Sequence, residues 1–170
     1  MKPDPGASYQ PLLEVTRAGL TESVHFGALA VVDSRGRLVA AQGDASLVAF
    51  PRSSLKPLQA VPFIQAGGQE AFGLSQAETA LICASHAGTD VHVENLRRFH
   101  DKVGLEEQDL GCGIHLPYHQ ATAQEMARRG EETSPFRHNC SGKHTGMLAY
   151  ARLGGWPLET YLEPDHPVQQ

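Results

Sequence analysis

The chain contains a serine and a lysine at a spacing that suits nucleophilic catalysis. Ser53 and Lys56 belong to the tetrapeptide SSLK, which begins a segment with apolar residues at helical spacing. Residues three apart on a helix are neighbours, so the Lys56 amine can reach the Ser53 hydroxyl. A neutral lysine amine can take the serine proton, and burial or a nearby cation such as Arg52 favours that neutral form. The spacing therefore predicts a serine nucleophile with a lysine base.

The same tetrapeptide has a simpler interpretation, in which Ser53 caps the helix and Lys56 is solvated. Two features favour the catalytic interpretation. Backbone N–H groups at the start of a helix can hold an oxyanion beside the nucleophile. Arg52 and Lys56 are also isolated charges between the apolar stretches 47–50 and 58–64, where isolated charges are often functional.

A second segment with chemical potential is ICASHAG, in which Ser85 and His86 follow an apolar run. Ser85 can place a hydroxyl in a cleft, and His86 can assist it or cap backbone carbonyls. The alternative is a helix that ends in an ordinary polar turn.

The third segment is HNCSGKH, residues 138–144, which is dense in potential metal ligands. Cysteine and histidine together suggest zinc, and Cys112, His115 and His119 add donors upstream. No C-x-x-C motif accompanies them, and a proline between the two upstream histidines prevents a regular H-x-x-x-H helix. A zinc finger is therefore not supported, whereas a non-catalytic zinc-binding module remains an alternative.

Strands are predicted at the beginning of the chain and helices after it. Alternation of apolar residues predicts β segments at 12–17, 23–33 and 37–44, and Gly36 supplies a hairpin turn at 34–37. From Phe50 the apolar spacing becomes helical, which predicts a helix that ends at Gly67-Gly68.

The later helices are predicted from their capping residues. Ser75 and Glu78 form an S-x-x-E capping box before a short helix that leads to Ser85. Thr89 or Asp90 caps the next helix, with Val93, Leu96, Phe99 or His100, and Val103 on its buried face. Further helices are expected at 121–130 and 141–153, each followed by glycine, and Asp165 is expected to cap a helix at the end of the chain.

Composition limits the classes of protein. The 170 residues carry 14 Lys+Arg, 19 Asp+Glu and a formal net charge of −5, with 41% hydrophobic residues. The basic residues are scattered, which argues against nucleic acid, and no apolar run could cross a bilayer. The first twenty residues lack the apolar stretch of a secretory signal, so a cytoplasmic location is expected. Three cysteines cannot all pair within the chain, which favours reduced thiols or a metal site.

Taken together, PRSSLKPLQAVP, ICASHAG, FRHNCSGKHTGMLA and HPVQQ resemble the L-asparaginase II family of rhizobial-type serine–lysine asparaginases. The resemblance covers residues 12–170, with residues 1–11 as a flexible N-terminus. It implies an α/β (α+β) fold similar to the serine β-lactamases and DD-peptidases, with antiparallel strands and a helical cluster. It also implies hydrolysis of L-asparagine to L-aspartate and ammonia, and a homodimer for the full-length protein.

The resemblance also implies roles for individual residues. Ser53 is the nucleophile, Lys56 its base, Ser85 a second catalytic serine, and Arg52 and His86 lie beside the substrate. Two residues of the third segment, Cys140 and Lys143, correspond to ligands of a zinc site.

The chain ends before several of the residues that complete the family's site. A partner lysine for Ser85 and the last cysteine ligand lie further along in the family, so we interpret the chain as the N-terminal half of the domain. Whether it is active alone is left open. A penicillin-recognising acyl-enzyme, which also uses S-x-x-K, remains the alternative of the same architecture.

Overall fold

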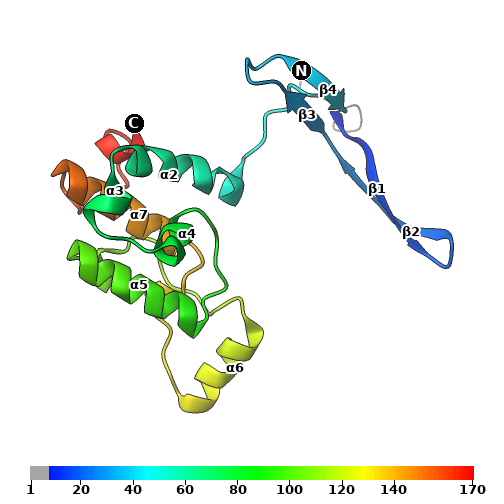
Figure 1. The fold of residues 1–170 in the computed structure, drawn as a ribbon. Helices are drawn as coiled ribbons and strands as arrows, with labels where there is room; N and C mark the ends of the chain where they lie inside the picture. Colours follow the sequence, from blue (N-terminus) through cyan, green and yellow to red (C-terminus); the bar gives the residue numbers. More distant parts are fainter. Residues whose placement is uncertain (1–7) are drawn as a thin grey trace. The chain divides into compact units, whose positions relative to one another are not determined.

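The computed structural model describes residues 8–170, and residues 1–7 lie outside the described part. Contacts divide the chain into two units, one ending at Phe50 and the other running from Pro51 to Gln170. Antiparallel strands form the first unit and helices form the second (Figure 1). The predicted α+β class, with antiparallel strands and a helical cluster, is confirmed.

The first unit consists of two separate antiparallel pairs of strands. They are β1 (Gln10–Arg17) with β2 (Leu20–Gly27), and β3 (Leu29–Val32) with β4 (Leu38–Gln42). The predicted strand 23–33 is thus interrupted at Ala28, because its two halves pair with different strands. The predicted flexible segment 1–11 lies mostly outside the described residues, although β1 already begins at Gln10.

The predicted hairpin turn joins β3 to β4. One carboxylate oxygen of Asp33 accepts hydrogen bonds from the backbone N–H groups of Arg35 and Arg37, both at 2.9 Å. Gly36 has φ of 74°, a conformation that glycine adopts without steric cost. The side chain of Asp33 and the glycine together fix the turn.

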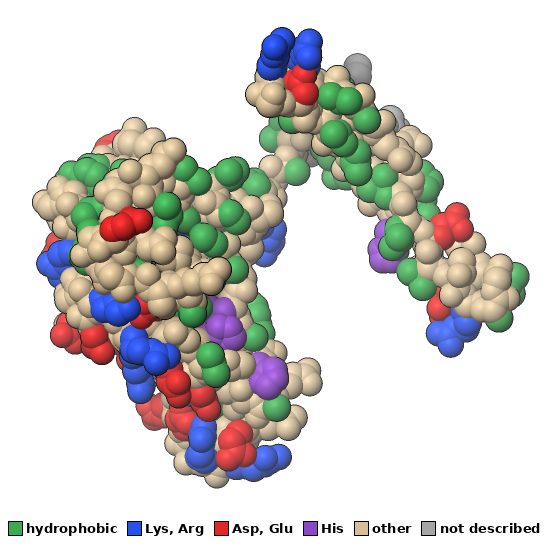
Figure 2. Space-filling view, viewed as in Figure 1, with side chains coloured by type: hydrophobic (Ala, Val, Ile, Leu, Met, Phe, Trp, Pro, Cys, Tyr) green, Lys and Arg blue, Asp and Glu red, His purple; other side chains and the backbone are tan. Residues whose placement is uncertain are grey.

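Hydrophobic side chains are exposed along these strands, as Figure 2 shows. Leu20, Phe26 and Val39 have 76%, 64% and 66% of their surface accessible. No residue from Tyr9 to Phe50 is buried. The first unit therefore has no hydrophobic core of its own among the described residues.

The second unit packs most of its helices against α7. Its helices are α2 (Lys56–Gln65), α3 (Gly68–Ala71), α4 (Gln76–Ile82), α5 (Asp90–Val103), α6 (Gln120–Arg129) and α7 (Ser141–Gly154). Helices α2, α4 and α5 contact α7 (Figure 1), and Phe63, Leu96, Phe99 and Leu148 are at most 2% exposed in the core between them. Within residues 8–170, none of the helices has the length and hydrophobicity of a membrane-spanning segment.

Most predicted helix ends are confirmed. Ser75 and Glu78 form the capping box of α4, and Thr89 caps α5. Helix α5 buries the predicted face, and glycines follow α6 and α7. The prediction that Asp165 caps the last turn is wrong, because His166 takes that position and its Nδ1 accepts a hydrogen bond from the Val168 N–H at 3.2 Å.

Candidate active site

Lys56 lies at the centre of a polar cluster inside the second unit. It is the first residue of α2, directly after a 3₁₀ turn at Arg52–Leu55, and it is only 3% exposed. Its amine nitrogen lies 2.8 Å from the Ser85 hydroxyl oxygen and 3.2 Å from the Cys140 sulfur. Two backbone carbonyl oxygens lie at 3.4 and 3.5 Å. A buried amine needs such acceptors, and these contacts supply them.

Ser85 connects the buried lysine to the predicted nucleophile. Its hydroxyl donates to the Ser53 hydroxyl oxygen at 3.0 Å, while the Lys56 amine contacts the Ser85 oxygen from the other side. The structure therefore joins Ser53 and Lys56 through Ser85, where the sequence predicted a direct contact. Both serines are exposed, so the chain of hydrogen bonds leads from the surface to a buried amine.

The segment that carries Ser85 is fixed to the start of α7 by its neighbour His86. The His86 backbone N–H donates to the Asn139 carbonyl at 3.2 Å. The Ser141 hydroxyl donates to a backbone carbonyl at 3.1 Å, so it accepts from the Nε2–H of His86 at 2.8 Å. The other ring nitrogen accepts from the Gly88 N–H at 3.1 Å. Both ring nitrogens are thus engaged within the protein.

His86 is neutral in this environment. Burial lowers its pKa from 6.5 to about 4, and the neighbouring His92 and Lys56 act in the same direction. A neutral ring with one donor and one acceptor matches its two hydrogen bonds. The role of His86 at the substrate stays a prediction, while its observed contacts hold the Ser85 segment in place.

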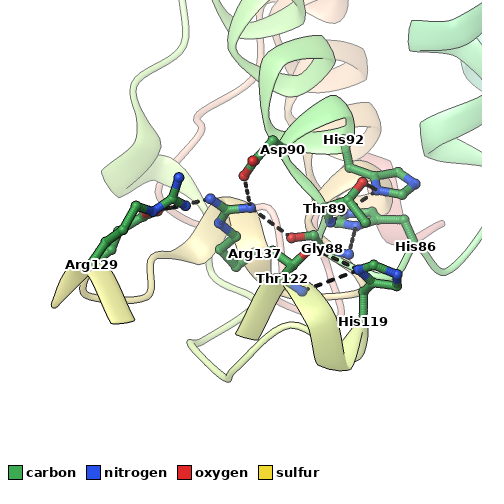
Figure 3. A network of polar contacts seen from close by, with 10 residues as sticks. His86, Gly88, Thr89, Asp90, His92, His119, Thr122, Arg129 and Arg137 are labelled. Atoms are coloured by element: carbon green, nitrogen blue, oxygen red, sulfur yellow. Dashed lines mark hydrogen bonds and ion pairs between the residues drawn. The ribbon is translucent and has the colours of Figure 1, made fainter. Parts of the chain in front are cut away.

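Arg137 stabilises the same segment from the opposite side (Figure 3). Its buried guanidinium donates to the Gly88 carbonyl at 3.0 Å and pairs with Asp90 at 2.7 Å and Glu131 at 2.9 Å. Sequence analysis did not single out Arg137 or Ser141. Their position in the sequence could have identified them, because Ser141 lies within the segment 138–144 and Arg137 directly precedes it.

Arg52 is exposed at the start of the 3₁₀ turn, beside Ser53. Its φ of 48° lies in the left-handed region, which costs a non-glycine residue about 1–3 kcal/mol. Backbone strain of this kind is common at active sites and in segments that hold ligands. The predicted substrate-binding role of Arg52 remains a prediction, and its exposure leaves the guanidinium accessible.

Cys140 and Lys143 provide two adjacent metal-donor groups. Cys140 caps α7 and Lys143 lies one turn later. A lysine ligand must be neutral, and burial lowers the pKa of Lys143 in that direction. Burial raises the pKa of the Cys112 thiol to about 11. The charge of Cys140 also raises this pKa, whereas the charge of Lys143 lowers it. Within residues 8–170, no three His, Cys, Asp or Glu side chains are grouped to hold a metal, and the zinc-ligand roles of Cys140 and Lys143 stay a prediction.

A cavity of about 160 Å³ lies between α2, α4 and α7. Lys143 lines it together with apolar side chains that include Phe63, Ile82 and Tyr150. Ser53 and Ser85 do not line this cavity. The exposed serines and the cavity are therefore separate features of the second unit.

The fold is α+β, and its helical unit brings Ser53, Ser85 and Lys56 into one hydrogen-bonded cluster. A model of the L-asparaginase II family matches residues 13–170, and the chain belongs to this family. No curated protein sequence matches it. The predicted family is confirmed, and membership implies an amidohydrolase with asparagine as its substrate.

Proposed function

We propose that the protein hydrolyses the side-chain amide of L-asparagine through an acyl-enzyme on Ser53. Membership of the L-asparaginase II family supports the substrate and the reaction class. The observation that carries the mechanism is the chain of two hydrogen bonds from the buried Lys56 amine through Ser85 to Ser53. We also propose that the scaffold is of the serine β-lactamase type, in which an S-x-x-K serine and lysine act together.

The first chemical step is acylation. The Ser53 oxygen attacks the carboxamide carbon after the two hydroxyl groups rotate, so that Ser53 gives its proton to Ser85 and Ser85 gives its own proton to the neutral amine of Lys56. The tetrahedral intermediate then collapses, and the leaving nitrogen takes a proton back along the same route and departs as ammonia. This leaves an ester between Ser53 and the aspartyl group.

The second step is hydrolysis of this ester. Water attacks the ester carbon and gives its proton to Lys56 through the Ser85 hydroxyl. The Ser53 oxygen then leaves the carbon and takes a proton back through Ser85, so that aspartate is released and Ser53 is regenerated. The exposed serines give substrate and water access, whereas the buried amine is shielded from solvent. The exposed guanidinium of Arg52 suits the substrate carboxylate.

Cys140 and Lys143 would hold a zinc ion in this proposal, with further ligands outside the pair. Bound zinc is a Lewis acid that polarises a coordinated oxygen. The fold holds the start of α7 in place, so that Cys140 lies beside Lys56.

The proposal is tested by ammonia release from L-asparagine with the full-length gene product. Ser53→Ala should lower kcat by about 10³-fold, since it removes the nucleophile. Ser54→Ala is the matched control, because that hydroxyl is also exposed but donates to the Pro51 carbonyl, and it should leave kcat within about two-fold. Undiminished turnover by Ser53→Ala would exclude Ser53 from the mechanism. Acylation of Ser53 by a β-lactam reporter, without asparagine turnover, would favour the penicillin-recognising alternative.

A further inference from the structure

The loop of residues 113–119 lies against the segment that carries Ser85, and the proposed reaction assigns this loop no role. The His119 backbone N–H donates to the Ala87 carbonyl at 3.0 Å. Pro117 is buried, and a Cβ added at Gly88 would come within 3.2 Å of it. The loop is therefore packed closely enough to influence the position of the groups around Ser85.

His115 is the residue of this loop that contacts the start of α7. Its Nδ1 lies 2.6 Å from the Leu116 carbonyl oxygen, and its Nε2 lies 3.1 Å from the backbone nitrogen of Asn139. A carbonyl only accepts and a backbone N–H only donates, so the ring hydrogen is on Nδ1 and Nε2 is the acceptor. The Asn139 side-chain oxygen also lies 3.1 Å from Nε2, and a half-turn of that amide brings its NH2 group there.

Neighbouring groups hold the His115 ring in this orientation. The ring stacks on Tyr118, with centroids 4.8 Å apart and 11° between the planes, and the His138 ring lies at 4.2 Å. The backbone carbonyl of His115 accepts a hydrogen bond from the Thr133 hydroxyl at 2.9 Å. The acceptor nitrogen of His115 therefore has a fixed place and a fixed direction.

The carbonyl of Asn139 connects this contact to the candidate active site. It accepts from the backbone N–H of His86 at 3.2 Å, and it lies 3.5 Å from the Lys56 amine nitrogen. His86 directly follows Ser85 in the chain. A shift of Asn139 would therefore displace an acceptor of the buried amine and an anchor of the Ser85 segment together.

We propose that His115 is a positioning residue for asparagine hydrolysis and that it acts through Asn139 on Lys56 and Ser85. This inference rests on the proposed function, because it takes Lys56 as the base and Ser85 as the proton carrier. A small displacement of a catalytic group slows the chemical step. Since His115 acts on the proton route, its loss should lower kcat and leave KM nearly unchanged.

Two replacements of His115 in the full-length gene product separate the hydrogen bond from ring packing. His115→Phe keeps a ring for stacking but has no acceptor, and it should lower kcat for ammonia release by about ten-fold, with KM within about two-fold. His115→Gln offers an amide oxygen to the Asn139 N–H and should restore kcat to within about three-fold of the parent protein. Recovery by glutamine also separates this role from metal binding, because an amide is not among the usual zinc ligands.

His119→Asn is the matched control from the same loop. The Nδ1 of His119 accepts from the Thr122 N–H at the start of α6, and asparagine also caps helices well. This variant should therefore keep kcat within about two-fold of the parent value. The proposal is wrong if His115→Phe keeps the parent kcat, if His115→Gln is as slow as His115→Phe, or if the loss appears in KM alone.

Two further measurements do not depend on turnover. Peptides that contain the His86 and Asn139 amides should exchange hydrogen faster in His115→Phe than in His115→Gln, while peptides of α5 exchange equally in both. Nitrogen NMR of the unaltered protein should find the ring hydrogen of His115 on Nδ1, and a hydrogen on Nε2 would overturn the inference even if a variant failed to fold. If the parent protein released no ammonia, the proposed hydrolysis would be refuted. Unequal exchange would then still support the hold of His115 on Asn139, and equal exchange would overturn it.

Discussion

Among single residues, Ser85 has the position on which the proton route depends. Its oxygen lies 2.8 Å from the Lys56 amine nitrogen and 3.0 Å from the Ser53 oxygen. Only a group that both donates and accepts can connect the two ends. A methyl group in its place would leave Ser53 without a path to the base.

Ser85→Ala should therefore lower kcat for asparagine hydrolysis by about 10²-fold, with a smaller change in KM, because positioned proton transfer typically contributes that much. Ser85→Thr keeps a hydroxyl and should recover part of the loss. Steady-state ammonia release for both variants provides the measurement. If Ser85→Ala and Ser85→Thr had equal kcat, the hydroxyl would have no part in proton transfer.

At the scale of elements, His86 couples the Ser85 segment to the first turn of α7 and makes that connection sensitive to acid. The pKa of His86 is about 4 in the folded chain and 6.5 when it is free of the fold. Between these values the unfolded chain binds more protons, so the free energy of unfolding decreases as the pH falls from 6.5 towards 4. The loss attributable to His86 is up to about 3 kcal/mol, at about 1.4 kcal/mol per pKa unit.

Replacement of His86 by glutamine tests this coupling, because the glutamine amide can still donate to Ser141 but does not titrate. His86→Gln should show a shallower decline in urea-derived stability below pH 6.5 than the parent protein. The groups that face His86 are the stacked ring of His92 at 4.9 Å and the more distant charges of Lys56, His138 and His115, and all remain in the variant. His25→Gln, at an exposed position in β2, is the control and should keep the original slope. An identical slope in His86→Gln would show that this ring does not couple folding to pH.

The packing of α4 on α7 depends on two glycines. A Cβ at Gly142 would collide with the backbone carbonyl of Leu81, and one at Gly146 would collide with the side chain of Ile82. Overpacking a core typically costs about 1–3 kcal/mol, which exceeds the gain of about 1 kcal/mol from alanine's helix propensity. Gly142→Ala should be the more destabilising in urea unfolding, since a backbone atom cannot rotate away.

Ile82→Ala provides the matched test for the second glycine. It should make Gly146→Ala less destabilising than in the parent background, because the colliding methyl group is gone. Equal stability of Gly142→Ala and the parent protein would contradict this packing.

For the molecule as a whole, local patterns were predictable and distant contacts were not. The buried face of α5 and the Ser75 capping box follow from residues within one or two turns, so the sequence pattern was sufficient. The break at Ala28 was missed because it depends on which strands pair. The candidate site depends on longer separations still: Lys56 is 29 positions from Ser85 and 84 from Cys140. Motif resemblance placed these residues in one site, but only the fold showed that Ser85 lies between Ser53 and the lysine.

The two units should also differ in their resistance to proteolysis. The unit from Pro51 to Gln170 has its own core, whereas none of residues 9–50 is buried. Val48 and Phe50, which are 96% and 93% exposed, precede the second unit and offer sites to thermolysin. Brief digestion should leave a fragment that starts near these residues, keeps its helical circular dichroism and unfolds cooperatively, because burial of apolar surface supplies most of its stability. Mass spectrometry identifies the fragment, and a recombinant chain of residues 51–170 is the control for its melting temperature. Rapid degradation of that chain, or loss of its cooperative transition, would show that the helical unit needs residues 1–50 to fold.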